Sequence, residues 1–280
     1  MIIFHLEAGP RNAAGNLREQ AAAVCRREAL DLLRRDPRKY ARILAALYLG
    51  HWRVERWRLR LLRACYFYFR LLDDVADGDR GCAIPAEALL GEQRARWHGA
   101  PRQSHEVEAN LLFEHLWAEI AQHSLPPARL RSFSAALLEG LRWDLQRRGE
   151  HFVPSAGEMG AYYEQVILAP AQIALAILGV REEPAELREL SILIGRLQSV
   201  RDLHSDMRAG VINIPREARG SAAPGDRDRW CDREVERCLP RMNELWAGLD
   251  SPSAWRSRLV FGSAVKTLQR WARTRKSGYR

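Results

Sequence analysis

The stretch "ACYFYFRLLDDVADGD" (64–79) joins a strongly apolar segment to a dense group of carboxylates. Its apolar residues continue the helical spacing of the preceding residues, so we predict an amphipathic helix over 57–77. The aspartates at the end of this helix are Asp73, Asp74, Asp77 and Asp79. Because the formal net charge of the chain is +9, so acidic a helix end calls for a specific explanation.

Helical spacing of apolar residues extends over almost the whole chain, and the alternation typical of β-strands is nearly absent. Among 280 residues, 47% are hydrophobic and 28% are charged, which is an ordinary composition for a folded protein. Breaks such as "GAPRQS" (99–104) contain residues that favour turns. We predict helices over 18–35, 39–50, 57–77, 108–123, 128–148, 156–179, 184–208, 233–249 and 254–275.

None of the breaks has the composition of an interdomain linker. We therefore predict a single all-α domain over residues 1–280, a helical bundle around a central cavity. The segment 166–178 is apolar on most of its circumference, which indicates a buried helix. The longest irregular stretch is 209–228, and loops of that length are usually functional or mobile.

The cellular setting is suggested by what the sequence lacks. Five scattered cysteines without a CxxC pair argue against a disulfide framework and a zinc site. The opening "MIIFHLEAGPRN" (1–12) has too short an apolar run for a signal peptide. No stretch approaches the about 20 apolar residues of a membrane span. We expect a cytoplasmic protein.

The surplus of arginine would suit a nucleic acid, a diphosphate or an anionic membrane surface. No nucleic-acid-binding motif accompanies the basic residues, so we expect no nucleic-acid partner. The C-terminal cluster "QRWARTRKSGYR" (269–280), with its interleaved aromatic residues, fits a peripheral contact with a membrane surface.

A second pair of aspartates lies in "RDLHSD" (201–206). Asp202 and Asp206 are four residues apart, as are Asp73 and Asp77, and residues at this spacing share one face of a helix. Two such carboxylates repel each other unless a cation lies between them. Hard oxygen ligands suit Mg²⁺, whose coordination is often completed by substrate phosphates. Two such helices facing each other would form a Mg²⁺ site.

An arginine precedes each pair, Arg70 before the first and Arg201 before the second. Guanidinium groups hold phosphates by charge-assisted hydrogen bonds. Gln198 adds an amide oxygen one turn upstream on the second helix. The aromatic run 66–69 lies one to two turns before the first pair, where it could line an apolar cavity that stabilises a carbocation. These features favour an enzyme that ionises a diphosphate.

Four segments together resemble the squalene/phytoene synthase family. Its two aspartate motifs are similar to "ACYFYFRLLDDVADGD" (64–79) and "LQSVRDLHSDMRAGVINIP" (197–215). Two helices between them, in "LLEGLRWDLQRR" (137–148) and "AYYEQVILAPAQIALAILG" (161–179), match further family motifs. The matching positions in these helices are Gly140, Asp144, Leu145, Tyr162, Val166 and Gly179. The resemblance extends over roughly residues 40–215.

The resemblance implies an isoprenoid synthase fold and a Mg²⁺-dependent prenyltransferase that ionises an allylic isoprenyl diphosphate. Family members condense two such diphosphates head to head, through a cyclopropylcarbinyl diphosphate. The metal ligands implied are Asp73, Asp77, Gln198, Asp202 and Asp206. The substrate-binding residues implied are Arg70, Arg201 and Gln198. The catalytic residues implied, beside the reacting carbons, are Tyr66 and Tyr162.

The chain departs from the family pattern at several positions. Gln198 replaces a usual asparagine, Ser205 a usual acid, and Val211 and Asn213 a usual arginine and tyrosine. An alternative function is therefore transfer of the prenyl group to a second small molecule, such as an aromatic acceptor, and another is ionisation without coupling. A different class, a non-catalytic basic helical protein that binds nucleic acid or a membrane, is opposed by the paired aspartates, because they repel phosphate unless Mg²⁺ bridges.

We also predict where residues close to these motifs lie. We expect Trp143 in the substrate cavity, and Asp144 as either a buried structural acid or a partner of a site residue. Asp74 and Asp79 are expected either beside the site or facing solvent. His204 lies off the face that carries the second aspartate pair, so we interpret it as a neighbour of the site.

Overall fold

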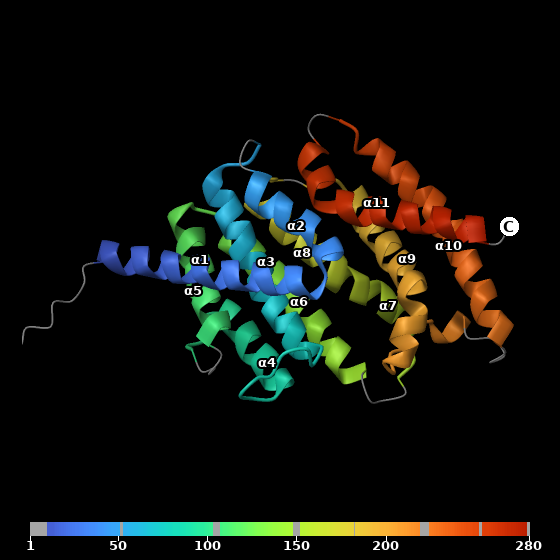
Figure 1. The fold of residues 1–280 in the computed structure, drawn as a ribbon, viewed down its shortest axis with the longest axis horizontal. Helices are drawn as coiled ribbons and strands as arrows, with labels where there is room; N and C mark the ends of the chain where they lie inside the picture. Colours follow the sequence, from blue (N-terminus) through green and yellow to red (C-terminus); the bar gives the residue numbers. More distant parts are fainter. Residues whose placement is uncertain are drawn as a thin grey trace, which may run out of the picture. The chain divides into compact units, whose positions relative to one another are not determined.

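Helix α3 (Arg56–Ala76) is the helix predicted over 57–77, and its two ends agree with the prediction to within one residue (Figure 1). Its apolar side chains are buried because they recur at helical spacing and face the neighbouring helices. The most deeply buried of them are Leu61, Phe67, Tyr68 and Leu72. The stretch that ends in aspartates is therefore the end of a core helix.

The computed structural model describes residues 10–50, 53–102, 107–147, 152–181, 183–218, 224–251 and 254–278. Most of the stretch used for the prediction about a signal peptide, residues 1–9, lies outside the described residues. Every regular element in the described ranges is a helix, so the all-α prediction is confirmed. The chain forms two compact units, Met1–Pro127 and Ala128–Arg280. The single domain over 1–280 stays a prediction.

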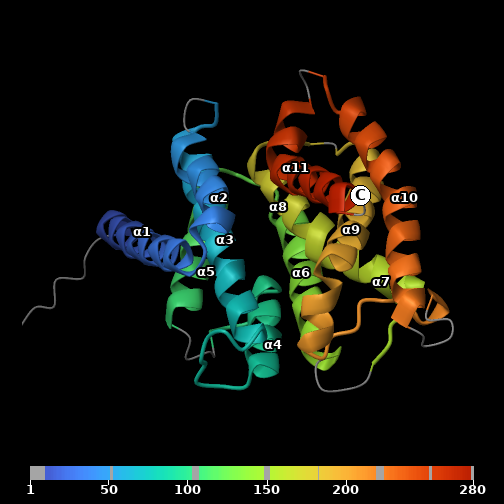
Figure 2. The same ribbon diagram turned by 45° about the vertical axis from the view of Figure 1, so that its right-hand side comes forward.

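The first unit contains α1 (Pro10–Arg35), α2 (Pro37–Leu49), α3, α4 (Ala86–Trp97) and α5 (Val107–Gln122). Helix α3 contacts all four of the others, which makes it the centre of this unit (Figure 2). Aromatic rings fill the space between α3, α4 and α5. Trp97 packs edge-on against Phe113 with ring centroids 5.2 Å apart, and it stacks on Phe69 at 6.4 Å.

Helix α4 is missing from the predicted helices. Its buried face combines Leu89, Leu90 and Trp97 with the polar residues Gln93 and Arg96. The polar Gln93 side chain can be buried at low cost because it accepts a hydrogen bond of 3.0 Å from the Tyr68 hydroxyl. Apolar spacing is blurred wherever polar side chains are buried with partners, so periodicity alone does not reveal such a helix.

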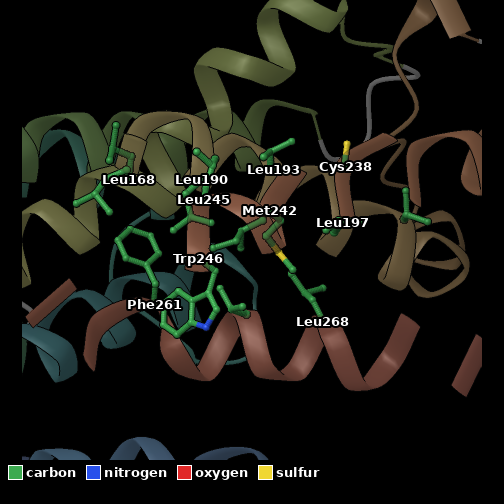
Figure 3. Close-up of a cluster of buried hydrophobic side chains, with 14 of the residues drawn as sticks. Leu168, Leu190, Leu193, Leu197, Cys238, Met242, Leu245, Trp246, Phe261 and Leu268 are labelled. Atoms are coloured by element: carbon green, nitrogen blue, oxygen red, sulfur yellow. The ribbon is translucent and has the colours of Figure 1, made fainter. Parts of the chain in front are cut away.

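The second unit contains α6 (Pro127–Arg147), α7 (Ala156–Tyr163), the π-helix η2 (Glu164–Leu168), α8 (Ala169–Ile177), α9 (Glu186–Arg208), the 3₁₀ turn η3 (Arg216–Ala218), α10 (Pro224–Gly248) and α11 (Trp255–Gly278). Its apolar core lies between α8, α9, α10 and α11 (Figure 3). Met242 and Trp246 of α10 are central in this core, and Leu197 of α9 and Leu268 of α11 pack into it.

The structure interrupts the helix predicted over 156–179. An α-helical segment ends at Tyr163, a π-helical turn follows, and α8 begins at Ala169. Pro170 lies in the first turn of α8 and has no backbone N–H to donate, so the regular hydrogen-bond ladder cannot pass through it. The π-turn accommodates the hydrogen bond that Pro170 cannot donate, and such turns are frequent at functional sites.

The irregular stretch predicted over 209–228 is shorter than expected, because α10 already begins at Pro224. The buried Ile214 and the η3 turn pack residues 211–218 onto the second unit. None of the helices in the described ranges combines the length and the apolar character that a membrane crossing requires.

Two glycines allow helices to approach closely near the π-turn. A Cβ atom at Gly195 of α9 would overlap the Tyr163 ring and lie 2.9 Å from Tyr163 Cβ. A Cβ atom at Gly140 of α6 would lie 2.7 Å from Val166 Cγ1 and 2.9 Å from Gln165 Cβ. Only hydrogen fits at these two positions. They therefore set the position of the π-turn against α6 and α9.

We predict that Gly195→Ala lowers the free energy of unfolding by about 1–3 kcal/mol, because the added methyl group overpacks the contact with Tyr163. Urea unfolding followed by far-UV circular dichroism measures the change. Gly160→Ala on α7 is the matched control, since a Cβ there meets nothing within 4 Å, and it should raise stability by at most about 1 kcal/mol. Equal effects of the two substitutions would contradict close packing at Gly195.

Candidate active site

The first aspartate pair lies at the C-terminal end of α3. Asp73 is in the last turn of the helix, and Asp77 is its C-cap residue, with a backbone N–H that donates to the Asp73 carbonyl at 2.7 Å. This bond continues the helical pattern through Asp77. The two side chains therefore keep the one-face spacing of a helix, with Cβ atoms about 5–6 Å apart.

Arg70 neutralises part of this acidic end. Its guanidinium donates to Asp73 Oδ2 at 2.7 Å and forms an ion pair with Asp74. Asp74 is only 2% exposed and also accepts from Arg35 of α1 at 3.1 Å. Asp74 is therefore a buried partner of the first pair's arginine, whereas Asp79 faces solvent.

The aromatic run 66–69 divides between core and surface. Phe67, Tyr68 and Phe69 are buried and pack within the first unit, which corrects the expectation that the run lines a cavity. Tyr66 is half-buried, and burial raises the pKa of its hydroxyl to about 12. Of the four rings, Tyr66 alone retains the accessibility that a site residue needs.

The second group lies on α9, where Gln198, Asp202 and Asp206 follow one another at four-residue spacing. The Arg201 guanidinium donates two hydrogen bonds to Asp202, from Nε to Oδ1 at 2.7 Å and from the terminal nitrogen to Oδ2 at 2.5 Å. Both aspartate pairs thus lie at helix C-termini, where the backbone carbonyls already carry partial negative charge. Such a position favours cations.

A chain of hydrogen bonds starts at the last aspartate of this group. The Asn213 amide donates to Asp206 Oδ2 at 2.6 Å and accepts from the Arg147 guanidinium at 2.6 Å. Arg147 also donates to Asp144 Oδ1 at 2.6 Å, and the Tyr162 hydroxyl donates to Asp144 Oδ2 at 2.7 Å. Four elements of the second unit meet here: α6, α7, α9 and the segment after α9.

The Arg147 guanidinium lies over two aromatic rings, with its Cζ 4.4 Å from the Trp143 centroid and 4.6 Å from the Tyr162 centroid. Trp143 and Tyr162 are themselves 4.7 Å apart. The expectation that Trp143 lies in a substrate cavity stays a prediction. Asp144 accepts a hydrogen bond from Tyr162, a residue predicted for the site.

Two pKa shifts have causes in this network. Burial raises the pKa of the Tyr162 hydroxyl well above its usual range, and the neighbouring Asp144 carboxylate adds to the rise. Tyr162 is therefore a neutral phenol at any physiological pH. Burial also raises the pKa of Asp206, and the hydrogen bond from Asn213 opposes that rise because it favours the charged carboxylate.

The donor set fits a hard cation. Each aspartate pair offers carboxylate oxygens on one helix face, and Gln198 adds an amide oxygen. Among the described residues, no three His, Cys, Asp or Glu side chains gather closely enough to hold a metal ion. The first pair lies in the unit Met1–Pro127, and the second lies in the unit Ala128–Arg280.

Sequence reasoning did not assign Arg147 and Asn213 to the site. Arg147 had a local signal, since it lies three residues after Asp144 on the same helix face. Asn213 was noted only as a departure from the family pattern, and its hydrogen-bond partners could not be foreseen because they are seven and 66 residues away in the chain. Only the tertiary structure brings its amide to Asp206 and Arg147.

Comparison with known proteins identifies the family to which this helical fold belongs. A model of the squalene/phytoene synthase family matches residues 45–270, which include both aspartate pairs. The chain belongs to this family of prenyltransferases.

Among solved structures, the squalene synthase HpnC from Alicyclobacillus acidocaldarius is similar, with a TM-score of 0.57 and 22% sequence identity. The similarity covers 90% of this chain and 95% of that one, and at this identity it supports the shared fold. A comparison with curated proteins found no significant match.

We predict that Asp144→Asn lowers the free energy of unfolding by about 3 kcal/mol, because it leaves the buried Arg147 guanidinium without its carboxylate. Asp232→Asn is the matched control, since Asp232 pairs with Arg275 at a half-exposed position where such pairs contribute at most about 1 kcal/mol. Urea unfolding of both variants measures the difference. A cost for Asp144→Asn no larger than that for Asp232→Asn would show that the buried pair does not contribute.

Proposed function

We propose that this chain catalyses the Mg²⁺-dependent, head-to-head condensation of two allylic isoprenyl diphosphates. The observation that carries the proposal is the placement of the two aspartate pairs. Each lies at the C-terminal end of a helix that packs into a core, and each has an arginine beside it. Both pairs fall within the residues that match the family.

The residues that would hold Mg²⁺ are Asp73 and Asp77 at the end of α3 and Gln198, Asp202 and Asp206 on α9. Bound there, Mg²⁺ would act as a Lewis acid that neutralises the diphosphate and makes it a leaving group. Metal binding would offset the negative charge of both aspartate pairs. It accounts for two like-charged pairs in a chain of net charge +9.

Arg70 and Arg201 would bind the diphosphate oxygens by charge-assisted hydrogen bonds. Their present ion pairs with Asp73 and Asp202 show that both guanidiniums reach the level of the carboxylates. A diphosphate bound at the carboxylates would therefore also meet the arginines. When the allylic C–O bond breaks, both bonding electrons leave with pyrophosphate, and these residues would stabilise the charge that develops on it.

Tyr66 and Tyr162 would lie beside the allylic cation. Both are neutral phenols, because burial raises the pKa of each hydroxyl. They can offer a ring face or a hydroxyl dipole to a cation, and neither acts as a phenolate. The Tyr162 hydroxyl already donates to Asp144, so its proton has a carboxylate neighbour during the rearrangement.

A second candidate function is transfer of the prenyl group to a non-isoprenoid small molecule, for example an aromatic acceptor. The observation that favours it is Asn213, which stands where the family resemblance expects a tyrosine and is engaged with Arg147 and Asp206. Ionisation of the first diphosphate would be common to both functions. The acceptor of the cation distinguishes them.

Incubation with Mg²⁺ and geranyl, farnesyl or geranylgeranyl diphosphate should release pyrophosphate and yield a coupled product. This product is the cyclopropylcarbinyl diphosphate, or the hydrocarbon that it gives when it loses its own pyrophosphate and a proton. An enzymatic pyrophosphate assay and chromatography of the extract measure the two products, and EDTA should abolish both. Pyrophosphate with only a prenyl alcohol would favour the second candidate function. No release with any of the three substrates would reject the enzyme proposal.

Asp77→Asn and Asp202→Asn should each reduce pyrophosphate release at least about a hundredfold, because each removes a charged metal ligand. Asp79→Asn is the matched control and should retain activity, since Asp79 is an exposed aspartate next to the first pair. Steady-state rates at saturating Mg²⁺ test the comparison. A fully active Asp202→Asn variant would exclude the proposed metal ligands on α9.

A further inference from the structure

We propose that Asn213 and Arg147 are positioning residues that hold the Asp206 carboxylate for metal binding. The inference rests on the proposed function, because it takes Asp206 as a metal ligand. It adds two residues to the site and assigns a role to the segment that follows α9 (Figure 1). Neither residue needs to touch substrate for this role.

The Asn213 amide bridges the Arg147 cation and the Asp206 anion by hydrogen bonds. Its oxygen accepts from Arg147 at 2.6 Å, and its nitrogen donates to Asp206 Oδ2 at 2.6 Å. The opposite amide orientation would set nitrogen against the guanidinium and oxygen against the carboxylate. Both hydrogen bonds would then be lost, so the two partners fix the amide in one orientation.

Arg147 is a rigid support for this amide. Its side chain is 4% exposed, and the guanidinium donates to Asp144 with one side and to Asn213 with the other. The rings of Trp143 and Tyr162 pack against it at 4.4 and 4.6 Å. A planar guanidinium held in this way loses little further freedom when it binds one more partner.

Asp206 needs such support because its surroundings oppose a carboxylate. It lies in the last turn of α9, near the negative end of the helix, and Asp202 is one turn away. The hydrogen bond from Asn213 engages one carboxylate oxygen, Oδ2, and so restricts rotation of the side chain. A ligand held in its binding orientation gains metal affinity because less freedom is lost on binding.

The test compares Asn213→Leu, which keeps the branched shape but removes both hydrogen bonds, with Asn243→Leu. Asn243 is an exposed asparagine on α10 and serves as the matched control. Mn²⁺ is the probe, since it binds hard oxygen ligands as Mg²⁺ does, and electron paramagnetic resonance measures its binding without turnover. Thermal unfolding in EDTA measures the stability of each metal-free variant.

Asn213→Leu should raise the Mn²⁺ dissociation constant, and the Mg²⁺ concentration for half-maximal pyrophosphate release, about tenfold. Asn243→Leu should change neither. Arg147→Met should weaken Mn²⁺ binding in the same direction, and the double variant should be no weaker than Asn213→Leu alone, since the two residues act through one contact. A lower unfolding temperature with unchanged metal affinity, or additive effects in the double variant, would overturn the inference.

The two proposals fail differently. Wild-type protein that binds no Mn²⁺ and releases no pyrophosphate would reject the proposed function, and the positioning role would be rejected with it. Wild-type protein that is active and binds Mn²⁺, with Asn213→Leu unchanged in both measurements, would reject the positioning role alone.

Discussion

Repulsion between carboxylates at helix C-termini is the constraint on which the rest of this structure depends. Asp73 and Asp77 end α3, Asp202 and Asp206 end α9, and in both helices the terminal carbonyls add negative charge. Within α3 and α9, Arg70 and Arg201 donate to Asp73 and Asp202 and offset part of this charge. The surrounding elements therefore supply countercharge and hydrogen-bond donors, each in its own unit.

The two units meet this requirement in different ways. In the first, Asp74 is buried between Arg70 and Arg35, so the arginine beside the pair is anchored to α1. In the second, Arg201 donates directly to Asp202, and the Asn213 amide donates to Asp206. Burial of these groups is tolerated because each charge has a partner of opposite sign or a hydrogen bond.

Close packing of helices at two glycines positions the hydrogen-bonded residues of the second unit. Gly195 admits the Tyr163 ring against α9, and Gly140 brings α6 against the π-turn. The π-turn follows directly on Tyr162 and Tyr163, so it sets where both rings lie. An irregular backbone at this point is consistent with a positional demand that a continuous helix from 156 to 179 would not meet.

The sequence by itself determined the helical class, most helix ends and the pairing of Asp73 with Asp77 and of Asp202 with Asp206. These depend on spacing along one helix, which is a local property. The tertiary structure decided the burial of Phe67 and Tyr68 in the core, the helix α4 with its buried Gln93, and the recruitment of Asn213 and Arg147. Such features depend on partners distant in the chain, and no periodicity within one segment carries that information.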